Sequence, residues 1–482
     1  MMENTTDLEN ETNRLYPEID KVFKLQKQNQ YNVAKTTSAQ RINKLKLLRT
    51  AITHTYNTEL KLAMYKELRK HETEVELNEI TPVVGAINFA IRRLKRWMQD
   101  DPVPTPMSLF GFSHRIKYEP KGVVLIIAPW NFPINLSLMP LVSALAAGNT
   151  IILKPSENTP HSSVVLKKMI NNLFDEGEIH VIIGGIQETT YLLKQPFNHI
   201  FFTGAPHVGK IVMKAAADNL ASVSLELGGK SPTIIDETAQ IEDAATRIAW
   251  SKCLNNGQIC IAPDYVLIHQ SRKNEFIKIY KEKVKQMYGS PADSESYGRI
   301  VNKRHFDRLR SYLDDAKEKG GNVLMGGQTD ASQNYIEPTV IGALPDTALL
   351  WQEEIFGPIL PIRTYSDIKE AIQFINSREK PLALYIYSKH KKRIKQIIDQ
   401  TRSGAVAINY SAVHYVNPHL PFGGSNNSGI GKANGYYGFQ AFSNAKGIQK
   451  HWSSPLNLLG LIYPPYTARK SKLAKLITKW FA

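Results

Sequence analysis

The sequence predicts an α/β protein with two successive units of alternating strands and helices. From residue 122 onward, continuous apolar runs such as Val123–Ile127 and Thr150–Leu153 alternate with helical segments, and such runs are typical of strands buried on both faces. The connections are short, which is the pattern of a doubly wound parallel sheet. Because 482 residues exceed what a single core organises, we expect more than one domain.

The first 100 residues predict helices rather than strands. Apolar residues between Ile42 and Ile52 recur at roughly helical spacing, and further helices are expected at 59–69 and 83–99. Proline cannot continue a helix, and three prolines interrupt the pattern: Pro102, Pro104 and Pro106. We therefore expect residues 107–121 to be extended.

Two α/β units follow along the chain. The first is expected to contain strands at 123–127, 150–153, 180–183, 199–202 and 221–225, with helices at 136–147, 162–174, 188–194 and 208–217. The second is expected to contain strands at 265–269, 322–325, 361–364, 382–386 and 405–408, with helices at 275–287, 305–319 and 368–375.

Composition excludes several classes of protein. Apolar residues make up 42% and charged residues 22% of the chain, as in an ordinary soluble globular protein. Two cysteines exclude a disulfide framework and fit a reducing compartment. The polar stretch 1–25 does not resemble a signal peptide, and the sequence has no apolar run of about 20 residues to span a bilayer. We therefore expect a cytoplasmic protein, and we expect no metal site.

The net charge of +16 is concentrated toward the carboxyl end. No Asp or Glu follows Asp399, whereas nine basic residues do: Arg402, Lys432, Lys446, Lys450, Arg469, Lys470, Lys472, Lys475 and Lys479. Such a surplus attracts nucleic acid, an acidic ligand or a membrane surface. The sequence contains no zinc-ligand spacing and no aromatic–basic sheet signature, so we expect no nucleic-acid partner.

A candidate nucleophile ends the stretch Asn255-Asn256-Gly257-Gln258-Ile259-Cys260. A thiol is the strongest neutral-pH nucleophile among side chains once its pKa is lowered. Asn and Gly are typical of turns, and turn backbone would leave the Cys260 sulfur accessible with amides near it. The alternative is that Cys260 is a small buried hydrophobic residue, as most free cysteines are. Cys253 is expected only to pack within a helix.

Two further stretches could assist a nucleophile. The turn 129–133 (PWNFP) would hold the Asn131 amide rigidly, so that it could donate a hydrogen bond to an oxyanion. Glu226 lies between an apolar strand and Gly228-Gly229, where its carboxylate could act as a general base. The alternatives are an aromatic turn in which Asn131 bonds to backbone, and a surface glutamate at a strand end.

Other stretches indicate a dinucleotide site at the ends of strands. Gly204 ends a strand and Gly209 lies at the start of the next helix, where phosphate can approach backbone amides. Lys154 and Glu157 follow the second strand and suit ribose hydroxyls and a phosphate. An acid and an aromatic further along could grip a ribose and stack on a ring: Glu354 and Phe356. The alternatives are a plain strand–turn–helix, a solvated loop and a domain-junction turn.

Taken together, these stretches resemble one family. The motifs PWNFP, KPSE, FTGxxxxGK, ELGGKSP, NNGQIC, EEIFGP and PFGGSNNSGIG, in this order and spacing, are similar to those of the NAD(P)-dependent aldehyde dehydrogenase superfamily. The match extends from about Tyr118 to Ser443. A short segment before PWNFP, and the stretch Tyr463-Pro-Pro-Tyr466, resemble the class 3 and fatty aldehyde branch.

The resemblance implies a fold and a reaction. The fold would be aldehyde dehydrogenase-like, with a Rossmann-type cofactor domain, a second α/β catalytic domain and a small bridging element. Cys260 would attack the aldehyde to give a thiohemiacetal and then a thioester, and Asn131 with the Cys260 amide would hold the oxyanion. Glu226 would activate water for hydrolysis. The substrate would be a medium- or long-chain aliphatic aldehyde or an aromatic one, and the product a carboxylic acid.

The resemblance also implies the cofactor contacts. The positions that would bind NAD, or NADP, are Trp130, Lys154, Glu157, Gly204, Gly209, Glu354 and Phe356. A carboxylate at Glu157 should repel a 2′-phosphate, which favours NAD over NADP. Two positions depart from the family: Ala205 stands where Ser or Asn is frequent, and Asn434 stands where this branch commonly has His.

By the same resemblance we expect four parts of the chain. A dinucleotide-binding domain would comprise residues 1–100 and 121–230, and a catalytic domain carrying Cys260 would comprise 231–410. Residues 101–120 and 411–450 would form a bridging element that builds a homodimer. The remaining residues, 451–482, would form a basic carboxyl-terminal tail.

The tail predicts an amphipathic helix. Its apolar residues fall on one stripe: Leu473, Leu476, Ile477, Trp480 and Phe481. Basic residues surround this stripe, which is typical of helices that lie on anionic membrane surfaces. We expect residues 467–482 to make a peripheral contact with the inner face of a membrane and to help deliver long-chain aldehydes. The alternative is an intramolecular or dimer contact.

Two other functions fit part of the pattern. A coenzyme A-acylating or phosphate-reducing relative of the same fold typically lacks the base, so the presence of Glu226 argues against it. A catalytically inactive binding protein would not need Cys260, Asn131 and Glu226 together.

Overall fold

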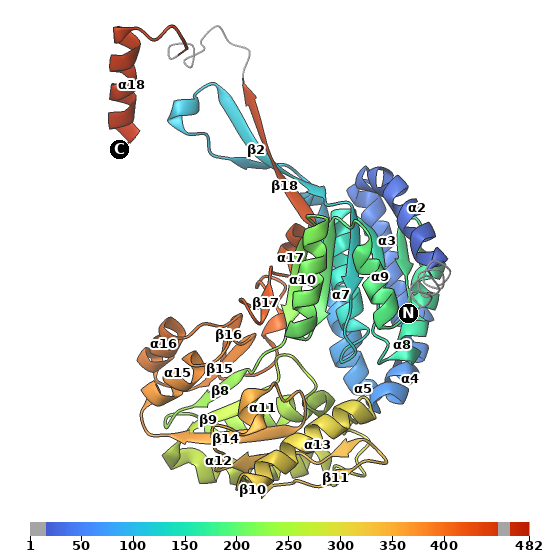
Figure 1. Cartoon of the computed structure of the whole chain (residues 1–482), viewed down its shortest axis with the longest axis vertical. Coiled ribbons are helices and arrows are strands. Elements are labelled where there is room, and N and C mark those ends of the chain that lie inside the picture. Colours follow the sequence, from blue (N-terminus) through green and yellow to red (C-terminus); the bar gives the residue numbers. More distant parts are fainter. Residues whose placement is uncertain (1–15, 452–462, 482) are drawn as a thin grey trace, which may run out of the picture.

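The computed structural model describes residues 16–451 and 463–481 of the 482-residue chain. Figure 1 shows two lobes, each built on a sheet with helices packed against it, and a long arm that extends from one lobe. The predicted α/β architecture with parallel sheets is confirmed.

The amino-terminal part is helical, as predicted. Its helices are α2 (Pro17–Ala34), α3 (Ser38–Thr50), α4 (Asn57–Leu68), α5 (Glu72–Val75) and α6 (Thr81–Trp97). Single π-helical turns at Ala51–Thr55 and Glu76–Ile80 join neighbouring helices. The apolar face of α6 packs on α7 (Asn135–Ala147), so this helical part contributes a wall to the site described below.

The first sheet has six strands in the order β17–β7–β6–β3–β4–β5. The strands are β3 (Val123–Ile127), β4 (Thr150–Lys154), β5 (Ile179–Val181), β6 (His199–Gly204), β7 (Ser222–Leu227) and β17 (Gly429–Ile430). All pairs are parallel except β17 with β7. The connecting helices are α7, α8 (Pro160–Leu173), α9 (Ile186–Lys194) and α10 (Pro206–Asp218). The strand order reverses between β3 and β6, and open parallel sheets bind ligands at such a switch point.

Glu226 lies inside β7 rather than in a turn after the strand. The apolar pattern predicts a strand that ends at residue 225, but β7 continues to Leu227. The extension is stabilised by β17, which places Gly429 opposite Glu226 and Ile430 opposite Leu225. Because β17 comes from far along the chain, the local pattern cannot reveal this pairing.

The second sheet has seven strands in the order β10–β13–β14–β9–β8–β15–β16. The strands are β8 (Pro232–Ile235), β9 (Tyr265–His269), β10 (Asn322–Met325), β13 (Thr339–Gly342), β14 (Ile359–Tyr365), β15 (Ala383–Tyr387) and β16 (Ala405–Ile408). Its helices are α11 (Ile241–Cys253), α12 (Lys273–Tyr288), α13 (Lys303–Glu318), α14 (Leu349–Gln352), α15 (Ile368–Asn376) and α16 (Lys391–Gln400). Strands β11 (Thr329–Asp330) and β12 (Tyr335–Ile336) form a separate ribbon.

The arm is a three-stranded antiparallel sheet. It consists of β1 (Asp101–Val103), β2 (Phe112–Pro120) and β18 (Ser443–His451), and β18 pairs with the whole length of β2. Helix α17 (Gly435–Ala441) precedes β18, and α18 (Ala468–Phe481) lies beyond the body of the molecule, near the arm (Figure 1). Within residues 16–451 and 463–481, no helix combines the length and the apolar character needed to cross a bilayer.

Candidate active site

Cys260 follows a backbone turn that few residue types can adopt. Asn255, Asn256 and Gly257 have positive φ angles of 47°, 53° and 70°. This left-handed region is costly for most residues, and Asn and Gly are the types that tolerate it best. A Cβ at Gly257 would lie 2.4 Å from the carbonyl oxygen of Gly357. The NNG part of the motif is therefore required by the shape of the turn that presents Cys260.

The side chain of Gln258 fastens this turn to the neighbouring chain. Its Nε2 donates to the carbonyls of Asn255 (2.9 Å) and Arg299 (3.1 Å), and its Oε1 accepts from the amide of Val301 (3.1 Å). The Asn255 side chain in turn donates to the carbonyl of Asn131 (2.9 Å). Because these groups are buried, each bond also avoids the cost of an unpaired polar atom.

Asn131 is joined to the same turn by its side chain. Its Nδ2 donates to the carbonyl of Gln258 at 3.0 Å, and the residue is only 3% exposed. A primary amide carries two N–H groups, so one remains to donate to a second acceptor. The bond to the Gln258 backbone is the alternative expected for Asn131, but the second N–H is left for a group in the larger cavity, which Asn131 lines, so its role as an oxyanion donor stays a prediction.

A buried ion pair contacts the backbone of Asn131, and the sequence patterns do not reveal it. Lys70 Nζ lies 2.8 Å from Glu79 Oε1 and donates to the carbonyl of Asn131 at 3.4 Å. The other carboxylate oxygen of Glu79 accepts from the amides of Ile134 (3.2 Å) and Asn135 (2.9 Å), at the start of α7, where a negative charge is favoured. Charged side chains usually lie in solvent, so nothing in the sequence singles these two out.

The Glu226 carboxylate is buried and lacks a full set of hydrogen bonds. Burial raises the pKa of Glu226 to about 8, and the Lys432 ammonium acts in the opposite direction. Among the described residues, Glu226 Oε2 has no hydrogen-bond partner. Lys432 is held in place by the carbonyls of Gly423 and Gly424, the latter at 2.9 Å. A carboxylate with a raised pKa and an open acceptor suits a general base.

The Cys260 thiol is protonated at neutral pH in this state. Burial, and after it the carboxylates of Glu354 and Glu226, raise the pKa of Cys260 to about 12. The backbone amides of Cys260 and Ile261 act in the opposite direction. A base must therefore remove the proton before the sulfur can attack a carbonyl, and the Glu226 side chain lines the same two cavities as Cys260.

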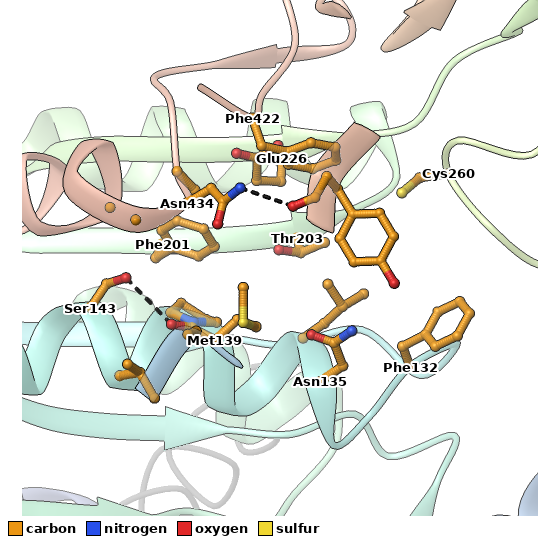
Figure 2. Close-up of a pocket in the computed structure, with 18 of the residues that line it drawn as sticks. Phe132, Asn135, Met139, Ser143, Phe201, Thr203, Glu226, Cys260, Phe422 and Asn434 are labelled. Atoms are coloured by element: carbon orange, nitrogen blue, oxygen red, sulfur yellow. Dashed lines mark hydrogen bonds between the residues drawn. The ribbon is translucent and has the colours of Figure 1, made fainter. Parts of the chain in front are cut away.

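Two cavities meet at Cys260 and Glu226. The larger has a volume of about 1030 Å³ and lies at the carboxyl ends of the strands of the first sheet, facing the second sheet. The smaller has a volume of about 130 Å³ and lies along α7. Both are lined by the Cys260 sulfur and by Glu226. The residues of the smaller pocket are shown in Figure 2, with Cys260 and Phe132 toward one end and Ser143 toward the other.

Four of the predicted cofactor residues line the larger cavity: Trp130, Gly204, Glu354 and Phe356. The rings of Trp130 and Phe356 are in edge contact, with centroids 5.3 Å apart. The Glu354 carboxylate lies so close to Gly228 that a Cβ there would be 2.1 Å from Glu354 Oε2. Burial raises the pKa of Glu354 to about 7. Gly228, the first glycine of the ELGGKSP motif, thus makes room for the Glu354 carboxylate.

The other three predicted cofactor residues are not among the described residues that line this cavity. Lys154 is buried at the end of β4 and pairs with Glu157 at 3.0 Å, whose side chain is 46% exposed. Gly209 is buried in α10, where a Cβ would lie 2.7 Å from a methyl carbon of Leu227. The structure therefore assigns Gly209 a packing role, which lets α10 approach β7 closely.

The larger cavity has the donor set of a dinucleotide site. The first turn of α10 lines it with Pro206 and His207, and amides at a helix amino terminus favour phosphate. Lys210 adds a positive charge, Glu354 a ribose acceptor, and Trp130 an aromatic face. Ala205, a departure from the family pattern, lies at the N-cap of α10 and has no side-chain hydrogen bond there.

The smaller pocket is mostly apolar. Its lining near Cys260 includes Phe132, Leu136, Met139, Ile259, Ile261 and Phe422. Asn434, the other departure, also lines it, but its Nδ2 donates to the carbonyls of Tyr415 and Asn417, both at 2.9 Å. The amide therefore stabilises the loop before α17.

Comparisons with known proteins show which family the chain resembles over most of its length. The model of the aldehyde dehydrogenase family matches residues 11–448. The chain is 44% identical over 430 residues to 4,4'-diaponeurosporen-aldehyde dehydrogenase of Staphylococcus aureus, which covers 89% of this chain and 92% of that protein. It is 43% identical over 418 residues to the dimeric NADP-preferring aldehyde dehydrogenase of Rattus norvegicus, covering 86% and 91%. A substrate-bound structure of Staphylococcus aureus AldH superposes with a TM-score of 0.91 at 42% identity, covering 95% and 99%.

Proposed function

The chain belongs to the aldehyde dehydrogenase family, as its motifs predicted, and from this premise we propose how its own residues act. It is an oxidoreductase that converts aldehydes to carboxylic acids with NAD or NADP. One observation carries the proposal for the site: Cys260 and Glu226 line both the larger, polar cavity and the smaller, apolar pocket. A dinucleotide in the larger cavity and an aldehyde in the smaller pocket would meet at Cys260.

The reaction begins at the Cys260 sulfur. Glu226 removes the thiol proton, and the thiolate attacks the aldehyde carbon while the free N–H of Asn131 and the Cys260 amide hold the oxyanion. When bound, NAD(P) supplies the acceptor for the hydride. Glu226 then releases the thiol proton to solvent, and the thioester left on Cys260 is hydrolysed by water that gives its proton to the Glu226 carboxylate. The network behind Asn131, which includes Lys70 and Glu79, keeps the oxyanion donor in place.

Trapping the covalent intermediate tests this proposal. In the Glu226→Gln variant we expect cofactor reduction to be slow, because the thiol has lost its base, and to stop after about one turnover, because the thioester is not hydrolysed. Mass spectrometry should then locate the acyl group on Cys260. Acyl transfer to added coenzyme A at a rate exceeding hydrolysis in the wild type would instead indicate the acylating class. Full steady-state turnover in Glu226→Gln would contradict the assignment of the base.

We propose that the chain prefers NAD to NADP. The Glu157 carboxylate follows β4 at the edge of the sheet where the larger cavity lies, and it is nearly half exposed. A 2′-phosphate at that edge would meet this negative charge, whereas a ribose hydroxyl could donate to it. The rat relative is named for NADP preference, so the ratio of the two catalytic efficiencies is the measurement that decides.

We also propose a homodimer built by strand addition. Among the described strands, β18 pairs with β2 and β16 pairs with β15, so each leaves one edge open. The amide of Ala405 donates to the Leu382 carbonyl, so the N–H of the next residue, Val406, points to the open side. Ile408 is 46% exposed beside it. We expect wild-type protein to have the mass of a dimer in light scattering and Val406→Pro to shift it toward the monomer. A monomeric wild type would refute the proposal.

For the tail, we propose contact with an anionic membrane surface. Helix α18 exposes Leu476 (56%) and Ile477 (39%) and carries no acidic residue. The two aromatic members of the predicted stripe, Trp480 and Phe481, lie outside the side chains that the structure describes. Burial of the stripe and attraction of its lysines would act together. Flotation with anionic vesicles, with and without residues 467–482, tests this. Equal binding by both would show that the tail packs on protein instead.

A further inference from the structure

We propose that Glu74 is a positioning residue for the Cys260 nucleophile. Its carboxylate holds the backbone of the turn 255–258, which presents Cys260. Glu74 belongs to residues 68–79, a segment named the brace below, and this segment also holds Asn131. The inference rests on the proposed function, in which Cys260 attacks the aldehyde and Asn131 holds the oxyanion. It adds that one amino-terminal segment sets how these two groups are aligned.

The brace bonds directly to the backbone of the turn. Helix α11 ends at Cys253, and two residues later the Asn255 N–H donates to Glu74 Oε1 at 3.1 Å. The positive φ angles of Asn255 and Asn256 take the chain out of the helix at this point. Asn255 is only 3% exposed, and a buried backbone N–H that has left a helix needs another acceptor. Glu74 supplies that acceptor.

A second contact anchors the brace to the chain beside the turn. The Leu68 carbonyl accepts from the Arg299 amide at 2.8 Å, and the Arg299 carbonyl in turn accepts from the Gln258 side chain. A Cβ at Gly298 would lie 2.9 Å from the Leu68 carbonyl oxygen, so the two backbones are in close contact. The Glu74 carboxylate therefore reaches the turn from a segment that is itself bonded next to it.

The brace also holds the oxyanion donor. Lys70 Nζ donates to the Asn131 carbonyl at 3.4 Å, and Glu79 accepts from two amides at the start of α7. The Asn255 side chain donates to the same Asn131 carbonyl at 2.9 Å. Asn131 follows β3 of the first sheet, whereas Asn255 precedes β9 of the second. The brace thus links the two lobes at the point where the sulfur and the amide must keep a fixed separation.

The brace carries two carboxylates around one ammonium group. Lys70 lies 2.8 Å from Glu79, while Glu74 accepts from the Asn255 amide. Burial raises the pKa of Glu74 to about 7 against the attraction of Lys70, and the Glu79 charge acts with burial. The Tyr288 hydroxyl at the end of α12 is a further titratable group near it. A protonated carboxyl group keeps a carbonyl oxygen that can accept a hydrogen bond, so the bond to Asn255 does not require the charge.

Removal of the Glu74 acceptor provides the first test. In Glu74→Ala we expect kcat to fall about tenfold or more, because the turn loses the bond that fixes it, with the aldehyde KM and the dinucleotide Kd unchanged. Glu74→Gln should keep kcat within about threefold, since its amide oxygen can accept the same bond. Glu72→Ala is the matched control, because Glu72 is exposed on the same helix, α5. An unchanged kcat in Glu74→Ala, or an equal loss in Glu74→Gln, would overturn the proposal.

Hydrogen exchange measures the brace without any reaction. In full-length Glu74→Ala, the amides of the peptide 254–262 should exchange about tenfold faster than in the wild type, whereas Glu74→Gln and Glu72→Ala should match the wild type. Unchanged exchange in Glu74→Ala, in a wild type that turns over through a Cys260 adduct, would reject the brace alone. Absence of that adduct would instead reject the proposed function, so the two failures can be told apart.

The pH dependence of stability provides a third test. A carboxyl group whose pKa is raised by folding stabilises the folded chain at low pH, and this contribution is lost as the pH rises through the folded pKa. Between pH 5 and pH 8, the denaturation midpoint of the wild type should therefore fall relative to that of Glu74→Gln, which has no charge to bury. A midpoint difference that stays constant over this range would show that the Glu74 carboxylate is not held against the turn.

Discussion

The two cavities that meet at Cys260 recognise their ligands by different physics. The larger, of about 1030 Å³, presents the Glu354 carboxylate, Lys210 and the amino terminus of α10. The smaller, of about 130 Å³, presents mainly methyl and aromatic groups, and the side chains of Ser143 and Asn434 in its lining donate to backbone carbonyls. The first selects a ligand by hydrogen bonds and charge, and the second by how much hydrocarbon it can bury.

The comparison teaches how the chain keeps cofactor and substrate selection apart. The residues that the cavities share include Cys260 and Glu226. Substitutions of these shared residues should therefore lower the rate of the reaction itself. Substitutions of residues that line only one cavity should instead change the binding of one ligand. Substitutions in the shared residues and on either side of them can test this division.

Removal of the shared thiol should have the largest effect. We expect Cys260→Ala to lower kcat by about 10⁴-fold or more, since covalent catalysis is lost. Dinucleotide binding, followed by fluorescence titration, should be retained because the larger cavity keeps its polar groups. Cys253→Ala is the control, since this thiol is buried in α11 away from both cavities. Comparable turnover in Cys260→Ala would refute the reaction proposed above.

Loss of the buried Lys70–Glu79 ion pair, which holds Asn131 in place, should have the second-largest effect. Lys70→Met leaves the Glu79 carboxylate buried without its partner, which should cost about 3–5 kcal/mol of unfolding free energy. We also expect kcat to fall about tenfold to a hundredfold, because Asn131 is less firmly held. Chemical denaturation and steady-state kinetics measure the two effects.

An exposed ion pair provides the control for Lys70. Lys168 pairs with Glu59 at 2.9 Å on the surface, and Lys168→Met should change neither stability nor kcat appreciably. If Lys70→Met behaved like this control, the ion pair would have no part in positioning Asn131.

The charge beside the base should have a smaller, pH-dependent effect. The Lys432 ammonium favours the ionised form of Glu226, whose pKa is about 8. Its loss in Lys432→Met should raise that pKa further, so a smaller fraction of Glu226 is ionised at pH 7 and kcat falls several-fold. The rising limb of the kcat–pH profile should move to higher pH, and the variant should approach the wild type in alkali. The exposed Lys446→Met should leave the profile in place; a shift to lower pH in Lys432→Met would contradict the assignment.

The smallest effect is expected at Glu157, which follows β4 at the edge of the first sheet. In Glu157→Gln the repulsion of a 2′-phosphate is removed, so the NAD-to-NADP ratio of kcat/KM should fall a few-fold. The KM for the aldehyde should not change, because Glu157 does not line the smaller pocket. A change in aldehyde KM with an unchanged cofactor ratio would show that the two sides are not independent.

Much of the site could be predicted because its motifs are local. The turn of Asn255–Gly257 needs residues that accept positive φ, and such residues are conspicuous in a sequence. The apolar run of β3 and the turn after it likewise indicate a strand that ends at a ligand site. The contacts that each motif makes in the folded chain were harder to predict. Gly209, for example, was expected beside a phosphate, and the structure shows that it packs against Leu227.

The residues missed by sequence patterns act through long-range contacts. Lys70 lies in the link after α4 and Glu79 in the π-helical turn before α6, and only the folded chain brings them to Asn131 and the start of α7. Lys432 belongs to a loop that folds back beside Glu226 with β17. The small residues that line the smaller pocket, such as Ala90, belong to no sequence motif and do not stand out before the chain is folded.

The α/β alternation could be read from the amino-acid sequence because strand and turn preferences are set by neighbouring residues, and the motifs indicated Cys260, Glu226 and Asn131 as candidates for the nucleophile, the base and the oxyanion donor. The pKa of Glu226, the support of Asn131 and the shape of the smaller pocket follow from the tertiary structure alone. Burial and charge depend on which distant segments pack together, and in this chain those segments are α6, α7 and the 423–438 loop and helix.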